Sequence, residues 1–78
     1  MEVRVLLYTV LKKYGEGKIR KDDRMTVPDR MTLENLASYL EIPDKPGKVF
    51  LVNGSPRDKE YVLQEGDEVK ILSFIGGG

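Results

Sequence analysis

The chain has 78 residues, enough for one hydrophobic core, and its thirteen basic residues balance thirteen acidic ones. Zero net charge removes the usual electrostatic argument for nucleic acid or an anionic membrane, and we expect neither as a partner. The sequence contains no Cys and no His. Disulfides, thiolate and imidazole metal sites, cysteine nucleophiles and His-based acid–base catalysis are therefore excluded, so the composition argues against a self-contained enzyme.

The first third of the chain predicts two strands. Residues 3–11 are rich in β-branched and aromatic side chains and are too few for a typical helix. Residues 18–27 alternate weakly between apolar and charged side chains, as an edge strand does. We expect the two to form an opening hairpin. The apolar stretch is too short to span a bilayer and lacks a signal-peptide cleavage site, so we expect a cytoplasmic protein.

The segment after Arg30 predicts a helix. Thr32 is a suitable N-cap, because its hydroxyl can accept a hydrogen bond from a free backbone N–H of the first turn. Pro43 cannot continue a helix, so we expect the helix to end near Glu41. Apolar residues between them recur at spacings of three and four and predict one buried stripe: Leu33, Leu36, Ala37, Tyr39 and Leu40.

The remainder of the chain predicts three more strands. Residues 48–52 are apolar and are followed by Asn53-Gly54, a pair that tolerates the positive φ angles of a tight turn. Residues 56–58 then lead into a short return strand. The last strand is expected from Glu68 to about Phe74.

The order of elements is therefore strand, strand, helix, strand, short strand, strand. A strand followed by a helical crossover normally returns to the same sheet with right-handed sense. This order predicts an α+β, β-grasp (ubiquitin-like) fold in which a mixed sheet of four to five strands packs on one helix. We expect residues 1–75 to form the domain and residues 76–78 to form a flexible glycine tail.

Alternation along the first and last strands predicts an apolar patch on the face away from the helix. If Val3, Val5 and Leu7 face the helix, the side chains between them face outward. In the β-grasp sheet these two strands are neighbours, so the patch would lead directly to the tail and mark an interface. A covering loop, or a register shifted by one residue, would remove it. Its expected members are Leu6, Tyr8, Leu72, Phe74 and Ile75, with Val10 and Lys70 on the same face; for residues 49–52 the alternation is ambiguous, because all four are apolar.

The sequence ends in three glycines, Gly76, Gly77 and Gly78. Attached to a strand fixed in the sheet, they would project as a thin arm that ends in a free carboxylate. An arm without Cβ atoms can enter a tunnel where side chains would clash. It suits a carboxylate that another protein must reach and activate; a frayed end and an expression scar are the plain alternatives.

Other polar residues are weaker candidates. Residues 18–24 mix both charge signs, which favours a solvated hairpin over a phosphate site. The acidic residues Asp22, Asp23, Glu65, Asp67 and Glu68 lack EF-hand spacing, so we expect no bound metal. The sequence also has no phosphate-binding glycine loop, and we expect no bound cofactor. Tyr61 is expected to pack under the connection before the last strand.

Several segments together point to a family: residues 3–11, the helix entry 31–33, the Val-Asn-Gly turn at 52–54, Leu-Gln-Glu-Gly-Asp-Glu-Val at 63–69 and Phe-Ile-Gly-Gly-Gly at 74–78. With them the sequence resembles the MoaD/ThiS family of ubiquitin-like sulfur carriers over nearly its whole length. The resemblance implies that a ubiquitin-activating-enzyme-like adenylyltransferase uses ATP to adenylate the carboxylate of Gly78, with Gly76 and Gly77 threading into that partner. A sulfur donor such as a cysteine desulfurase then supplies the sulfur of a thiocarboxylate. The chain would be a carrier cosubstrate with no catalytic residue.

Two acceptors compete within this family: the large subunit of molybdopterin synthase and the thiazole synthase of thiamine synthesis. Chain length, the long opening hairpin and residues 7–14 resemble the molybdopterin (or tungstopterin) carriers, whereas an aromatic and an aliphatic residue before the glycines resemble the thiamine carriers. We predict the molybdopterin-type carrier. Two alternatives come from other functional classes. One is a ubiquitin-like modifier conjugated through Gly78 to lysines of target proteins, and the other is a plain β-grasp interaction domain.

Overall fold

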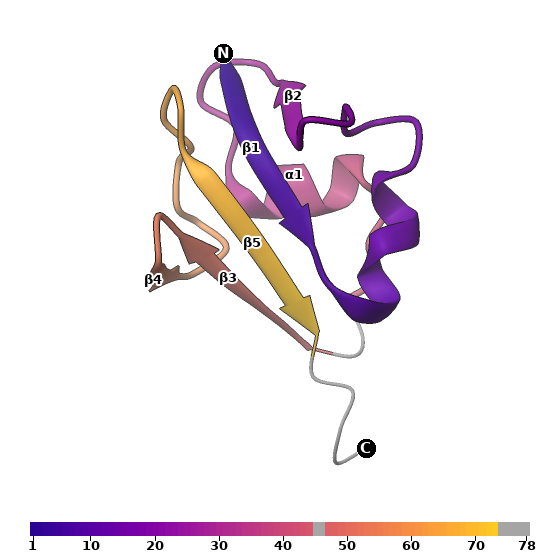
Figure 1. The fold of residues 1–78 in the computed structure, drawn as a ribbon. Helices are drawn as coiled ribbons and strands as arrows, with labels where there is room; N and C mark the ends of the chain where they lie inside the picture. Colours follow the sequence, from indigo (N-terminus) through magenta and orange to yellow (C-terminus); the bar gives the residue numbers. More distant parts are fainter. Residues whose placement is uncertain (45–46, 74–78) are drawn as a thin grey trace.

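The sheet has five strands in the order β2-β1-β5-β3-β4, and one α-helix packs across it (Figure 1). This computed structural model describes residues 1–44 and 47–73, apart from the side chain of Thr9. In chain order the elements are β1 (Glu2–Leu7), the 3-10 helix η1 (Thr9–Gly15), β2 (Arg24–Thr26), α1 (Leu33–Tyr39), β3 (Lys48–Val52), β4 (Ser55–Arg57) and β5 (Glu68–Ser73). The expected β-grasp arrangement is confirmed.

The two central strands are the first and the last in the sequence. β1 and β5 run parallel, with Val5 opposite Val69 and Leu7 opposite Ile71. β2 pairs antiparallel with β1 at one edge, and β3 pairs antiparallel with β5 on the other side. The expected adjacency of the first and last strands is therefore confirmed, and both point toward the same end of the sheet (Figure 1).

The first strand is shorter than its sequence predicts. β1 ends at Leu7, and Thr9–Gly15 form η1 rather than a continuation of the strand. Leu7 and Leu11 are both buried, and a strand continued through Leu11 would also place these two residues on the same face. The pattern of burial therefore did not distinguish the two structures. Val10, expected on the outer face of the sheet, lies in η1 and is 49% exposed.

The second strand is also shorter than expected. β2 covers three residues instead of residues 18–27, but it is an edge strand and pairs antiparallel with β1, as predicted. The chain between the two strands contains η1 and further turns, so this is a wide connection rather than a tight hairpin. Lys18 in this connection donates hydrogen bonds to the carbonyl oxygen of Tyr39 at 2.7 Å and to the carboxylate of Glu41 at 2.9 Å, linking it to the end of α1.

The helix begins where the sequence predicts. The Thr32 hydroxyl accepts a hydrogen bond from the Asn35 backbone N–H at 3.1 Å, and the Asn35 side-chain oxygen accepts from the Thr32 N–H at 3.2 Å. The helix ends at Tyr39, slightly before the predicted end near Glu41, whose φ of 60° leaves helical geometry. Tyr39 was wrongly assigned to the buried stripe: it is 53% exposed, and its ring lies 5.2 Å from the Lys18 ammonium.

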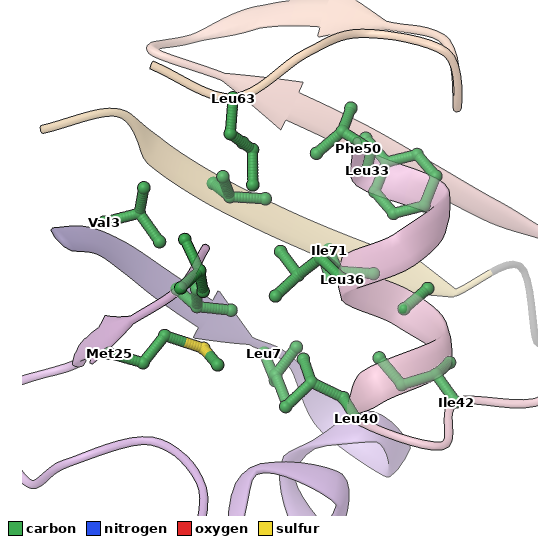
Figure 2. Packing of buried hydrophobic residues seen from close by; sticks show 14 of the residues in the cluster. Val3, Leu7, Met25, Leu33, Leu36, Leu40, Ile42, Phe50, Leu63 and Ile71 are labelled. Carbon is green, nitrogen blue, oxygen red and sulfur yellow. The ribbon is translucent and has the colours of Figure 1, made fainter. Parts of the chain in front are cut away.

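The hydrophobic core lies between the sheet and α1 (Figure 2). Alternate residues of β1 and β5 point into it, as predicted. On the helix side, Leu33 and Leu36 of α1 and its C-cap Leu40 have essentially no exposed surface. In β3 the buried residues are Phe50 and Val52, which resolves the ambiguity at 49–52. Leu63, in the connection before β5, closes one end of the core.

The turn after β3 has the predicted geometry. Asn53 and Gly54 have φ angles of 52° and 87°, the left-handed region that an Asn-Gly pair tolerates. The return strand β4 begins at once, at Ser55, rather than after residue 58 as expected. Within the described part of the chain, the helices are too short or too polar for crossing a membrane.

Candidate functional site: the outer face of the sheet

The face of the sheet away from α1 presents an apolar area at the end where β5 finishes. Leu6 and Lys70 lie directly opposite each other on β1 and β5, and Leu51 on β3 lies opposite Lys70 on its other side. Leu72 of β5 is opposite Val49 of β3. All five side chains are partly exposed. We call these five residues the outer-face patch.

The outer-face patch contains part of the surface that the sequence predicts. Leu6 and Leu72 face outward as expected, and Val49 and Leu51 are additions that alternation alone did not reveal. Tyr8 is partly buried and extended (φ −120°, ψ 150°), one residue beyond β1. Phe74, Ile75, Gly76, Gly77 and Gly78 lie outside the described residues. The docking role of this surface therefore stays a prediction.

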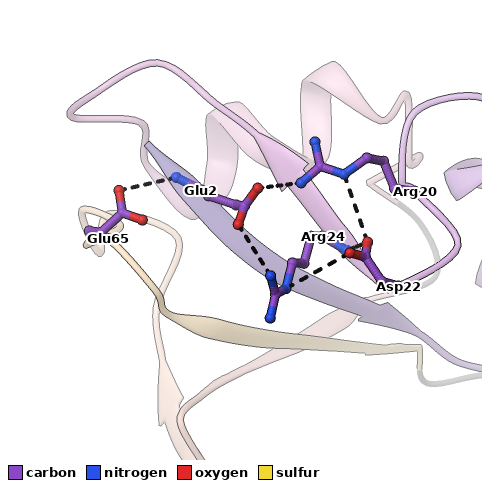
Figure 3. Close-up of polar contacts among 5 residues, drawn as sticks. All are labelled: Glu2, Arg20, Asp22, Arg24 and Glu65. Carbon is purple, nitrogen blue, oxygen red and sulfur yellow. Dashed lines mark hydrogen bonds and ion pairs between the residues drawn. The ribbon is translucent and has the colours of Figure 1, made fainter.

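The opposite end of the same face is polar. Arg4 donates to the carboxylate of Glu68 at 3.0 Å. Beside it, Glu2 accepts from Arg20 and also lies 3.7 Å from Arg24 (Figure 3). Both of these arginines contact the carboxylate of Asp22 as well, at 3.7 and 4.0 Å. Because these guanidinium groups are matched by carboxylates, the network fits the solvated hairpin expected for residues 18–24 better than a phosphate site.

Asp67 is a buried acid whose role the sequence did not reveal. Its carboxylate accepts three hydrogen bonds, from the Asn53 side-chain amide at 2.9 Å and from the Tyr61 hydroxyl and the Gln64 backbone N–H at 2.8 Å each. The Asn53 side-chain oxygen in turn accepts from the Glu68 N–H at 2.9 Å. The network joins the turn after β3 to the start of β5. The sequence signal for this network was the presence of two turn-forming residues, Asn53 and Asp67, next to two strands that pair.

The environment of Asp67 also affects Tyr61, which packs partly buried against the core. Burial raises the pKa of the Tyr61 phenol, and its hydrogen bond to the Asp67 carboxylate raises that pKa further. Since protein donors already occupy the Asp67 carboxylate, it is poorly suited to a cation. In the part of the chain that the structure describes, no group of three acidic side chains is arranged to hold a metal ion.

A groove of about 860 Å³ lies between α1 and the β3–β4 edge. Three acidic and three basic residues line it, so it has no excess of either charge: Glu34, Asp44, Asp58, Lys48, Arg57 and Lys59. Two pairs lie close together, Glu34 with Lys59 at 3.8 Å and Asp44 with Lys48 at 4.0 Å. This balance gives the groove no charge preference for a ligand.

The sheet order, the single crossing helix and the outer-face patch define a ubiquitin-like β-grasp protein with an apolar face beside the end of its last strand. Comparison with known proteins gives the family: a sequence model of the ThiS family matches residues 6–78, and the chain belongs to that family. The crystal structure of SAMP1 from Haloferax volcanii is similar, with a TM-score of 0.69 and 16% sequence identity over 100% of both chains, which shows the shared fold. A comparison with curated protein sequences gave no match. Membership of this family places the chain among the small sulfur carriers, and the structural likeness shows that its fold is ubiquitin-like.

Proposed function

We propose that this protein is a sulfur carrier whose C-terminal Gly78 is adenylated and then converted to a thiocarboxylate. The observation that supports it best is the ThiS-family match, which extends through the three glycines to residue 78. The fold supports it as well. β5, the last strand, is held between β1 and β3 in the centre of the sheet, so the strand that precedes the C-terminal segment has a neighbour on each side.

The chemistry requires an activated carboxylate, because hydroxide or oxide is a poor leaving group. An oxygen of the Gly78 carboxylate attacks the α-phosphorus of ATP on the partner enzyme, and pyrophosphate leaves. A persulfide sulfur of the donor then attacks the carbonyl carbon of the acyl adenylate, and AMP leaves. A second thiol of the donor system cleaves the resulting S–S bond, which yields the thiocarboxylate and a disulfide between the two thiols.

This chain supplies the carboxylate and the surface that positions it, and its partners supply the catalytic groups. The sequence has no Cys or His to act as nucleophile or general base. In this proposal the outer-face patch docks on a ubiquitin-activating-enzyme-like adenylyltransferase, while Gly76 and Gly77 enter its active-site tunnel. ATP is bound by that enzyme, and the chain is a cosubstrate rather than a catalyst.

The proposed acceptor is the large subunit of molybdopterin (or tungstopterin) synthase. The long connection between β1 and β2 and the length of the chain support this choice. Thiazole synthase is the alternative acceptor, supported by the Phe74-Ile75 pair before the glycines. Conjugation through Gly78 to lysines of other proteins is the alternative from the modifier class, and it would use the same activation step.

The test is the intact mass of the protein after incubation with ATP, a sulfur donor and the activating enzyme from the same organism. We expect a shift equal to the exchange of one oxygen for sulfur, located at Gly78 by fragmentation. A Gly78 deletion variant is the control and should show no shift. Absence of both the shift and the adenylate with an active enzyme would contradict the proposal.

The acceptor is identified in a second step with the thiocarboxylated protein. Incubated separately with molybdopterin synthase large subunit and with thiazole synthase, it should lose its sulfur only to the former. Sulfur loss to thiazole synthase alone would select the thiamine alternative. Amide-linked conjugates of higher mass in cells, absent in the Gly78 deletion variant, would reveal a modifier.

A further inference from the structure

The outer-face patch has a cation at its centre. Lys70 lies on β5, the middle strand of the sheet, with Leu6 directly opposite on one side and Leu51 directly opposite on the other. Leu72 follows two residues later on the same face. The residue is only partly exposed. A lysine in such a position can lay its aliphatic part along apolar neighbours and keep its ammonium group in water.

Lys70 combines partial burial with the lack of an ion pair, whereas the other described lysines that form no ion pair are exposed: Lys12, Lys13 and Lys21. Lys18, Lys48 and Lys59 each lie within 4.0 Å of a carboxylate. Lys70 forms no ion pair with any residue in the described ranges 1–44 and 47–73. The acidic residue two positions earlier on the same face, Glu68, is bonded to Arg4 at 3.0 Å. The Lys70 charge therefore has no carboxylate partner among the described residues.

A protein that covers this patch must remove water from the Lys70 ammonium. Burying an unpaired charge costs several kcal/mol, which opposes the gain from the apolar contacts around it. A carboxylate on the partner, placed opposite the ammonium, compensates that cost and fixes the register of the two surfaces. A partner surface that is entirely apolar would be penalised at this position.

We propose that Lys70 is a specificity-determining residue of the docking face, and that the enzyme that activates Gly78 presents an Asp or Glu carboxylate to it within an otherwise apolar surface. This inference rests on the proposed function, since it takes the outer-face patch to be the surface that docks on that enzyme. It adds the chemistry of the partner: apolar contact with Leu6, Leu51 and Leu72, and one acidic group at the centre.

The experiment compares Lys70→Met with the wild-type chain. Methionine keeps the unbranched shape but has no charge. Calorimetric titration of each purified full chain into the activating enzyme gives the dissociation constant. If the partner carries a carboxylate there, Lys70→Met leaves it buried and unpaired, and we expect binding to weaken about tenfold or more. Lys70→Glu should weaken it further, and Lys70→Arg should retain most of the affinity.

Lys21→Met is the matched control, because Lys21 is an exposed lysine in the connection before β2 and away from the patch. It should bind like the wild type. Thermal unfolding of each variant verifies that the fold is retained. If Lys70→Met unfolds, the comparison of binding by Lys70→Arg and by Lys70→Glu still tests the inference. Equal or tighter binding of Lys70→Met would overturn the inference, because it would show an apolar partner surface.

Adenylation of Gly78, measured by intact mass in the same samples, separates this inference from the proposed function. Normal wild-type adenylation combined with unchanged binding of the Lys70 variants overturns the role of Lys70 and leaves the carrier function standing. A wild-type chain that is neither bound nor adenylated by an active enzyme contradicts the proposed function, and the inference fails with it.

Discussion

Asp67 shows how one buried side chain can set the geometry of a functional strand. It is 6% exposed, and its two oxygens accept from an amide in the turn after β3 and from a phenol and a backbone N–H in the connection before β5. A buried carboxylate is tolerated only when such donors replace water. Because β5 begins at the next residue, these contacts fix where the strand that leads to the tail starts.

Replacement of Asp67 by Ala should strongly destabilise the fold. The Asn53 amide, the Tyr61 hydroxyl and the Gln64 N–H would lose their acceptor, and we expect the free energy of unfolding to fall by about 2–4 kcal/mol. Urea denaturation measures this. Glu60→Ala, at an exposed position in the same connection, is the control and should change stability little. Equal stability of the two variants would show that the network contributes nothing.

Tyr61 should make stability depend on pH in the alkaline range. Burial and the Asp67 carboxylate raise the pKa of the Tyr61 phenol above its ordinary value of 10.0. A folded-state pKa above the unfolded one means that this stabilisation is complete below pH about 10 and is lost as pH rises through the folded-state pKa. Urea denaturation across this range should show the loss in the wild type and a smaller one in Tyr61→Phe. Identical pH profiles would contradict the assignment.

At the scale of elements, α1 depends on its cap and on its buried side. A helix of seven residues is too short to be stable by itself in water, so its stability comes from packing and from the hydrogen bonds at its ends. Leu33 and Leu36 are completely buried against the sheet. The reciprocal hydrogen bonds between Thr32 and Asn35 satisfy two backbone N–H groups at the start of the helix.

Thr32→Ala should therefore lower the free energy of unfolding by about 1 kcal/mol, because the Asn35 N–H loses its side-chain acceptor. Thermal or urea unfolding measures the change. Ser38→Ala, at an exposed position of the same helix, serves as the control and should not destabilise, since alanine has the higher helix propensity. A loss at Ser38 as large as that at Thr32 would argue against a specific capping contribution.

At the scale of the whole molecule, the outer face is divided between charges at the start of β1 and the outer-face patch at the end of β5. Leu72→Asp should weaken binding to the activating enzyme about tenfold or more, because a charge replaces an apolar contact at the interface. The stability cost should be about 1 kcal/mol, since Leu72 is partly exposed. Calorimetric titration and urea denaturation measure the two effects. An unfolded variant, or one that binds normally, would contradict this assignment of the face.

Gly77→Ala tests the tail directly. The added methyl group should clash in a tunnel that accepts a chain without Cβ atoms, and we expect the rate of adenylation to fall about tenfold or more without any change in stability. Adenylate formation, followed as release of pyrophosphate, measures the rate. Normal adenylation of this variant would refute the threading argument.

Much of the fold was predictable because local patterns and the global fold agree. The alternation in β1 and β5, the Thr32 cap and the Asn53-Gly54 turn are local signals, and each specifies its structure through neighbouring residues. The 3-10 helix was not predictable, because Thr9 and Val10 favour a strand and the burial of Leu11 suits both structures. The 3-10 helix packs against β1 and β5, contacts that depend on the tertiary structure.

The sequence by itself determined the order of the five strands and α1, the inward residues of the central strands, the family resemblance and the triple glycine. These features depend on residue type and on spacing along the chain. Only the tertiary structure decided that Asp67 is held by three donors, that Val49 and Leu51 face outward, and that Lys70 lies between two leucines without a described carboxylate partner. Such features depend on strand register, which brings residues far apart in the sequence into contact.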